Sequence, residues 1–161
     1  MAAIALRQFN AVTSGGASEA AGFVDRQRQE SRRQLQGSYI LGQQAKGSIN
    51  ELCQVVEECR QANWDGYGAA PVSVRAFQLA YEFLEALPLG TSAPSVGAEP
   101  DGHITLEWYR SPRRTLSISV SPEGELHYAA LMGASKAYGT EPFFGEVPKE
   151  LMDLIQRITS A

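Results

Sequence analysis

The spacing of apolar residues changes along this chain from a helical period to strict alternation, and then back again. From Ile49 to Leu87, apart from the linker around Trp64, apolar residues recur every three or four positions. From Val96 to Met132 they occupy every second position, and from Leu151 the helical period returns. Helices repeat every 3.6 residues and strands every two. The sequence therefore predicts an α+β fold in two layers, in which helices cover the apolar face of an antiparallel sheet.

Three helices are predicted on this basis. They cover residues 49–62, 73–87 and 148–158. The first should begin at a capping box, in which Ser48 and Glu51 satisfy each other's backbone amides. Ser73 suits the N-cap of the second helix, Pro88 ends it, and Pro148 suits the start of the last.

A four-stranded antiparallel meander with one apolar and one polar face is predicted between the helices. Its strands are centred on residues 96–98, 104–109, 115–121 and 126–132. Pro100-Asp101-Gly102 and Pro122-Glu123-Gly124 supply turn residues between strands. Residues 133–146 hold aromatic residues among Gly and Pro, and there we expect an irregular segment or a short edge strand.

Charge divides the chain into an arm and a body. Residues 1–50 hold six Lys or Arg against three Asp or Glu, whereas residues 51–161 hold eight against fifteen. The first 46 residues are rich in Ala, Gly, Ser and Gln and lack a sustained apolar period. We therefore expect a basic, low-complexity arm over residues 1–46 and a single α+β domain over residues 47–161.

The cysteines and the hydropathy indicate a cytoplasmic protein outside the membrane. Cys53 and Cys59 are six residues apart in a predicted helix, a spacing that places them on different sides and prevents a disulfide. Free thiols suit a reducing compartment. No apolar run reaches the roughly 18 residues of a membrane span, and Arg7 interrupts the apolar start.

The sequence carries no signature of a metal, nucleotide or other cofactor site. His103 and His127 are the two histidines, and both occupy the polar phase of their strands. A small hydrolase would combine one of them with Glu107 and with Ser117 or Ser119, but no sharp turn presents a nucleophile. We expect no catalytic residue and no cofactor, and we keep the hydrolase as an alternative.

The linker between the first two predicted helices is the main candidate for partner contact. Trp64 must either cover the core as a lid or be offered to a partner, and Asp65, Tyr67 and two glycines surround it. Tyr109 and His127 lie on the polar face of the predicted sheet. These five residues form the predicted protein-binding site, and self-association is kept as an alternative.

Arginine supplies an alternative from another functional class. Two basic clusters contain seven arginines: Arg26, Arg28, Arg32 and Arg33 in the arm, and Arg110, Arg113 and Arg114 at a predicted hairpin tip. If both clusters met in space, they would grip phosphates of a nucleic acid. The acidic remainder of the chain favours instead an arm that folds back on the body or docks to an acidic protein.

The run Asn63-Trp64-Asp65-Gly66-Tyr67-Gly68-Ala69, with the following helix, the Pro100-Asp101-Gly102 turn and Ile104 to Trp108, resembles a group of small uncharacterised bacterial proteins. The resemblance covers roughly residues 50–158 and implies no established activity. Such proteins look like companions of toxin–antitoxin or phage-defence loci, so the resemblance implies an accessory or neutralising role. We expect a protein-binding module rather than an enzyme.

Overall fold

The computed structural model describes residues 43–160 of the chain. All described residues belong to one unit of the chain, residues 39–161. Four arginines of the predicted arm lie outside the described residues: Arg26, Arg28, Arg32 and Arg33. Within residues 43–160, no helix has the length and apolar character needed to cross a bilayer.

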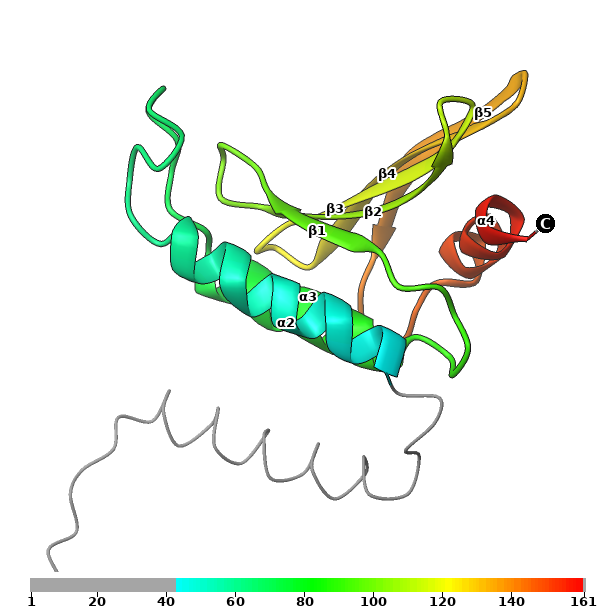
Figure 1. The fold of residues 1–161 in the computed structure, drawn as a ribbon, viewed down its shortest axis with the longest axis horizontal. Coiled ribbons are helices and arrows are strands. Elements are labelled where there is room, and N and C mark those ends of the chain that lie inside the picture. Colours follow the sequence, from blue (N-terminus) through cyan, green and yellow to red (C-terminus); the bar gives the residue numbers. More distant parts are fainter. Residues whose placement is uncertain (1–42, 161) are drawn as a thin grey trace, which may run out of the picture. The chain divides into compact units, whose positions relative to one another are not determined.

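Residues 43–160 form a layer of helices packed on one face of an antiparallel sheet (Figure 1). The helices are α2 (Gln43–Glu58), α3 (Val74–Ala86) and α4 (Lys149–Thr159). The strands are β1 (Ser95–Ala98), β2 (Ile104–Ser111), β3 (Arg114–Val120), β4 (Glu125–Met132) and β5 (Ser135–Pro142). Neighbouring strands follow the order of the chain. The predicted α+β arrangement of two helices, a meander and a final helix is confirmed.

The second and third predicted helices begin where their capping residues indicate. The Ser73 hydroxyl accepts hydrogen bonds from the backbone amides of Arg75 and Ala76, at 3.2 and 3.4 Å, and α3 follows it. Pro148 lies directly before α4. Both helices bury one apolar stripe, as their period predicts.

The first helix departs from the prediction at both ends. α2 begins at Gln43 and ends at Glu58, so Ser48 lies inside the helix and its assignment as the N-cap is wrong. The Ser48 side chain is only 2% exposed, and its hydroxyl donates to the carbonyl oxygen of Pro94 at 2.6 Å. This serine ties α2 to the segment before β1, a contact across 46 residues that no local pattern indicates.

The core lies between the helices and the inward face of the sheet. Alternate residues are buried from Ile104 to Trp108 in β2 and from Leu116 to Val120 in β3, together with two residues of β4: Ile104, Leu106, Trp108, Leu116, Ile118, Val120, Leu126 and Ala130. Leu52, Phe83 and Ile155 bring the three helices into the same cluster. Each large apolar side chain buried in this way stabilises the fold by about 1.5–3 kcal/mol. The Trp108 indole N–H donates to the carbonyl oxygen of Ser92 at 2.7 Å, which satisfies its polar atom.

Residues 135–142, for which the sequence allows an irregular segment or a short edge strand, form the strand β5, so the meander has five strands rather than four. The inward positions of β5 carry Ala137 and Gly139 instead of large apolar residues, so the alternation that marks a strand is weak. Tyr128 of β4 lies over Gly139, where an added Cβ would come within 2.8 Å of the tyrosine Oη. A large residue on β4 thus covers the inward side of an edge strand made of small ones.

Candidate functional site

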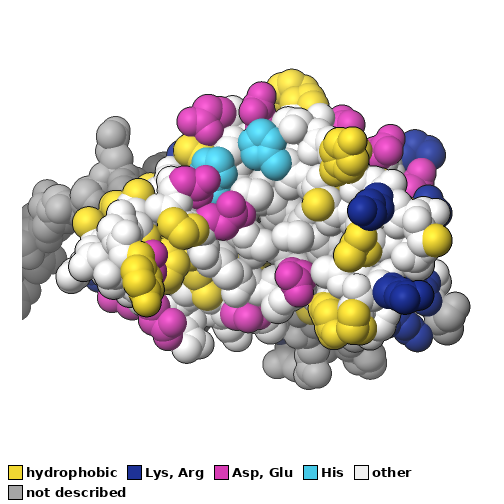
Figure 2. Space-filling model, turned by 90° about the horizontal axis from the view of Figure 1, so that it is seen from above, with side chains coloured by type: hydrophobic (Ala, Val, Ile, Leu, Met, Phe, Trp, Pro, Cys, Tyr) yellow, Lys and Arg dark blue, Asp and Glu magenta, His cyan; other side chains and the backbone are white. Residues whose placement is uncertain are grey.

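The outward face of the sheet is covered by none of the helices in residues 43–160. The strands direct one phase of residues into the core and the other outward, and the pairing places the outward residues side by side. We call this surface the exposed face. Its central row crosses all five strands and contains Ser95, Glu107, Ser117, Ala129 and Tyr138. Figure 2 shows this side of the molecule, with both histidines, acidic groups, apolar side chains and basic groups in view.

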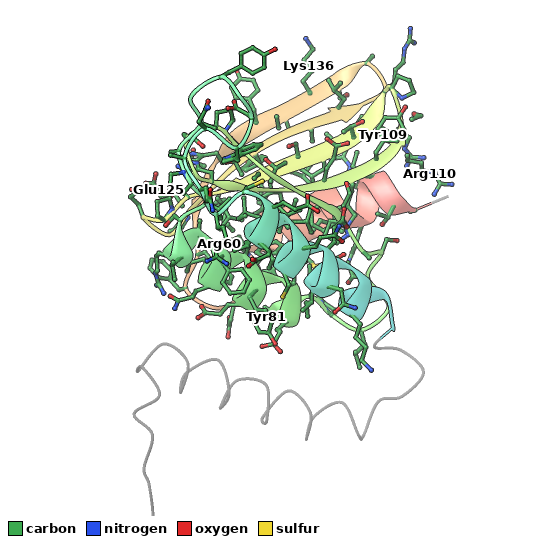
Figure 3. The ribbon with its side chains drawn as sticks, turned by 60° about the vertical axis from the view of Figure 1, so that its left-hand side comes forward. Arg60, Tyr81, Tyr109, Arg110, Glu125 and Lys136 are labelled. Carbon is green, nitrogen blue, oxygen red and sulfur yellow. The ribbon has the colours of Figure 1, made fainter. Side chains whose placement is uncertain are left out.

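Charge is segregated along the strands. Four basic residues occur between Ser95 and Pro142, and all lie at one end of the sheet, which we call the basic end: Arg110, Arg113, Arg114 and Lys136. Five acidic residues lie at the opposite, acidic end: Glu99, Asp101, Glu123, Glu125 and Glu141. Glu107 alone lies in the central row. Figure 3 shows Glu125 and Arg110 at opposite ends of the strands.

Apolar side chains occupy the exposed face between these ends and toward the basic end. Tyr138 is 82% exposed, Tyr109 is 62% exposed and Leu131 is 40% exposed. Ala129 pairs with Tyr138 in the central row and is also exposed. Each of these exposed side chains leaves a large apolar area in water. Exposed apolar areas of this kind are typical of binding surfaces rather than of a sheet face that contacts only solvent.

The two histidines stack at the acidic end. Their ring centroids are 6.3 Å apart and the rings are inclined by 13°. His103 Nδ1 lies 3.3 Å from Ser119 Oγ, and His127 Nδ1 lies 2.9 Å from Thr140 Oγ1. His127 Nε2 is also 3.7 Å from a Glu125 carboxylate oxygen. Each ring is thus held on the sheet by one hydrogen bond to a neighbouring strand, His103 to β3 and His127 to β5.

Of the predicted hydrolytic combination of a histidine, Glu107 and Ser117 or Ser119, the described residues bring His103 and Ser119 into contact, but the geometry of this pair does not suit proton relay. The Asp101 carboxylate lies 3.7 Å from His103 Nδ1, the same ring nitrogen that faces Ser119. A catalytic triad uses one ring nitrogen for the nucleophile and the other for the carboxylate. Both partners compete here for one nitrogen, so the imidazole is not oriented to remove a proton from the serine.

Glu99, Asp101 and His103 bring three ligand-type atoms within 4.8 Å of one another, a grouping that the sequence did not predict. Both carboxylates already serve the β1–β2 turn. Glu99 accepts a short hydrogen bond from Thr105 Oγ1, and Asp101 accepts one from the His103 backbone amide at 3.2 Å. The hydrogen bonding of the turn accounts for the grouping, and we assign no metal to it.

The predicted arginine cluster at the hairpin tip is mostly engaged within the protein. Arg110 donates to the carbonyl oxygen of Thr159 at 2.9 Å, and Arg114 donates to that of Arg157 at 2.6 Å. These carbonyls belong to the last turn of α4, where the negative end of the helix dipole attracts cations. Arg113 and Lys136 form no ion pair within the described residues. The arm cluster lies outside them.

The linker around Trp64 has one well-defined shape. Asp65 accepts hydrogen bonds from the backbone amides of Tyr67 and Ala69 at 2.8 and 3.1 Å, which lower the pKa of its carboxyl group. Asn63, at a φ of 63°, accepts from the Gly68 amide at 2.8 Å. The carboxylate of Asp65 and the side-chain amide of Asn63 therefore hold the loop closed by hydrogen bonds to its own backbone.

Trp64 and Tyr67 differ in exposure within this loop. Trp64 is partly buried against the core, and its indole N–H donates to the carbonyl oxygen of Ala70 at 2.9 Å. Tyr67 is 94% exposed. Of the predicted lid and anchor roles, Trp64 therefore has the contacts of a lid, and Tyr67 presents a free aromatic ring.

The loop continues onto the β1–β2 turn at the acidic end of the sheet. Ala70 donates its amide to the Pro100 carbonyl at 2.8 Å, and Ser73 donates to that of Gly102 at 2.9 Å. A Cβ on Gly102 would lie 2.7 Å from the Pro71 carbonyl oxygen, so the two segments approach as closely as a glycine permits. The loop is fixed to the sheet independently of any partner.

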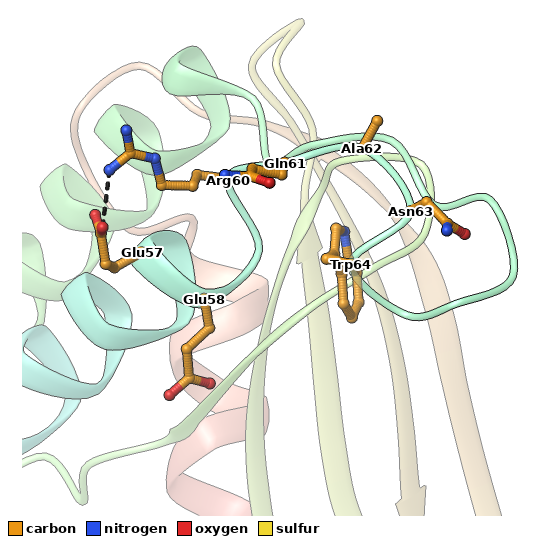
Figure 4. Close-up of a pocket in the computed structure, with 7 residues that line it drawn as sticks. All are labelled: Glu57, Glu58, Arg60, Gln61, Ala62, Asn63 and Trp64. Carbon is orange, nitrogen blue, oxygen red and sulfur yellow. Dashed lines mark hydrogen bonds and ion pairs between the residues drawn. The ribbon is translucent and has the colours of Figure 1, made fainter.

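A shallow pocket of about 490 Å³ lies between the end of α2 and this loop (Figure 4). It is lined by Glu57, Glu58, Arg60, Gln61, Ala62, Asn63 and Trp64. Glu57 and Arg60 form an exposed ion pair at 2.8 Å beside it. Ligand pockets bury most of their ligand among apolar groups, and this one is polar and opens to solvent.

Tyr109 and His127 both lie on the exposed face. Tyr109 is next to the central row on the side of the basic end, and His127 is next to it on the side of the acidic end. Trp64, Asp65 and Tyr67 lie apart from them in the loop. Tyr138, Leu131 and Lys136 also lie on the exposed face, and the sequence reading did not select them. The alternation of Lys136, Tyr138 and Thr140 was the available signal, but it needed β5 to be recognised as a strand.

Comparisons with protein-family models, curated proteins and solved structures find no match to this chain.

Proposed function

We propose that this protein is a binding module for another protein chain, without catalysis of its own, and that the exposed face is its binding surface. The observation that carries the proposal is the exposure of Tyr109, Leu131 and Tyr138 on a sheet whose other face is closed by helices. Protein interfaces are enriched in aromatic residues at their centre and surround them with polar groups. The exposed face carries both exposed aromatic side chains and polar groups.

Rigidity of the surface also favours binding. The exposed residues stand on paired strands, and the loop with Tyr67 is closed by its own hydrogen bonds. A preorganised surface loses little conformational entropy when a partner docks. The stacked histidines fit this role better than catalysis, because His103 Nδ1 faces both Ser119 and Asp101.

The resemblance of the Trp64 loop to small bacterial proteins supports a more specific form of the proposal. In that form the module is a cytoplasmic accessory or neutralising component, similar to an antitoxin or to a part of a phage-defence system. The analogy rests on the loop and the meander pattern, and it is tested by the identity of whatever binds the exposed face.

Nucleic acid is the second candidate partner, and one observation favours it. Tyr109 and Tyr138 are exposed on an antiparallel sheet near Arg113 and Lys136, and aromatic rings on such sheets stack on unpaired bases. The acidic end and the engagement of Arg110 with α4 weigh against it. Binding of mixed oligonucleotides that falls steeply with salt would favour this candidate over a protein.

A photo-crosslinking amino acid at position 138 tests the proposed function in living cells. We expect a discrete covalent adduct from position 138 and none from position 74, where Val74 is exposed on α3 in the helix layer. The two sites are matched in exposure, so a difference reports the surface rather than accessibility. Equal labelling at both positions, or no adduct at either, would contradict the proposal.

A further inference from the structure

We propose that the exposed face binds a second copy of this chain, and this rests on the proposed function of that face. The two sheets stack face to face with their strands reversed, about a twofold axis that lies in the interface and runs across the strands along the central row. The proposal follows from the segregation of charge, from the position of the apolar groups, and from the size of the surface.

The separation of acidic and basic residues between the two ends of the sheet favours a second copy as the partner, and it determines the direction of the twofold axis. An interface between identical chains must be complementary to itself, because each residue that contacts a second residue is contacted by it in return. An axis parallel to the strands would place the acidic end on the acidic end of the second copy. An axis across the strands places each acidic end on the basic end of its partner, so that Glu125 faces the region of Arg113 and Lys136.

The same axis brings the apolar groups of β4 and β5 together at one side of the stacked sheets. Residues of the central row meet their own counterparts, so Tyr138 packs near the Tyr138 of the second copy, and Ala129 lies beside them. Leu131 lies one register step toward the basic end, and therefore meets the row of the partner that contains His127. A tyrosine pair across an interface is favourable, since aromatic rings bury a large area at small entropic cost.

The area available agrees with a weak but specific dimer. Five strands about 4.8 Å apart, most of them seven or eight residues long at about 3.3 Å per residue, give a footprint of roughly 600 Å² per copy. Two such footprints reach the lower limit of about 1,200 Å² for specific interfaces. The footprint is thus at the low end for specific interfaces, and we expect a reversible rather than an obligate dimer.

Glu107 is the unfavourable residue of this arrangement, and so provides a sharp test. It lies in the central row on β2, and the axis brings it toward the Glu107 of the second copy. Replacing it by glutamine removes a like-charge contact while preserving shape. The dimer of Glu107→Gln should be several-fold tighter than that of the natural chain.

Sedimentation velocity on the full chain measures the dimer. Lys136→Glu and Glu125→Lys should each weaken self-association by about tenfold or more, because each places like charges at both ends of the interface. An equimolar mixture of the two variants should restore the dimer, since each reversed charge then meets its opposite. Arg75→Glu on α3 and Glu51→Lys on α2 change charge by the same amounts away from the face, and should leave association unchanged.

Several outcomes overturn the proposal, and they differ from failure of the proposed function. If the natural chain stays monomeric at high concentration, the dimer proposal is overturned. The proposed function would still stand if position 138 crosslinked to a protein whose mass differs from that of this chain. A crosslink from position 138 to residues 1–42 of the same chain would make the arm the occupant instead. A dimer that responds to Lys136→Glu but not to Glu107→Gln would indicate pairing of β5 edges, which also overturns the stacked arrangement.

Discussion

Replacing Gly102 by alanine should lower the free energy of unfolding by about 3 kcal/mol. Gly102 has a φ of 89°, where an L-residue pays about 1–2 kcal/mol, and the added Cβ would lie 2.7 Å from the Pro71 carbonyl oxygen. Because that atom is backbone, the clash is relieved only by moving the loop away from the turn. This weakens the hydrogen bonds from Ser73 to Gly102 and from Ala70 to Pro100, each worth about 1 kcal/mol.

Gly66→Ala is the matched control for this substitution. Gly66 has a φ of 78°, but nothing lies within 4 Å of an added Cβ, so only the backbone strain of about 1–2 kcal/mol is expected. Urea denaturation followed by tryptophan fluorescence gives both free energies, and the two tryptophans report on the loop and the core. Equal costs for the two variants, within about 0.5 kcal/mol, would refute the claim that the contact between loop and turn stabilises the fold.

Three further expectations concern the contacts that hold α2 and the loop. Trp64→Ala should cost about 2–3 kcal/mol in urea denaturation, less than the roughly 3–5 kcal/mol of a fully buried aromatic residue, because its ring is only partly covered; a cost near zero would restore its role as an exposed anchor. Ser48→Ala should cost about 1–2 kcal/mol by the same assay, because it leaves the buried Pro94 carbonyl without its partner; an unchanged midpoint would contradict this. Hydrogen bonds lower the pKa of Asp65, so the carboxylate contributes fully to the free energy of unfolding above the ordinary pKa of about 4, and this contribution is lost as pH falls through the lowered pKa. Acid titration of Asp65→Asn should lack this loss of stability. Identical curves of stability against pH for the two proteins would count against the prediction.

The sequence predicted elements whose apolar residues face the core, and was less reliable where the deciding contact is distant or polar. α3, α4 and the strands β2 to β4 each carry a continuous apolar phase, and all are present where expected. Ser48 has the local pattern of an N-cap, but its partner is Pro94 across 46 residues. For residues 133–146 the sequence allows either an irregular segment or a short edge strand, because Ala137 and Gly139 give the inward side of β5 only a weak apolar signal.

The candidate site shows the same division. Tyr109 and His127 were placed on the outward phase of their strands from alternation alone, and the pairing confirms that phase. The roles of Arg110 and Arg114 were not predictable, since the carbonyls that they bind lie 49 and 43 residues further along the chain. Segregation of charge between the two ends of the sheet becomes visible only when the register of all strands is known.

The backbone contacts of the loop after Trp64 bear on how the domain opens. Ala70, Val72 and Ser73 lie outside helices and strands, yet their amides donate to carbonyls of the β1–β2 turn and of Cys59. An amide bonded in this way exchanges its hydrogen only when the segments on both sides separate. These three amides should therefore exchange with deuterated solvent as slowly as amides of the neighbouring strands. The linker would then belong to the same cooperative unit as the helices and sheet it connects, and would not act as a hinge between them.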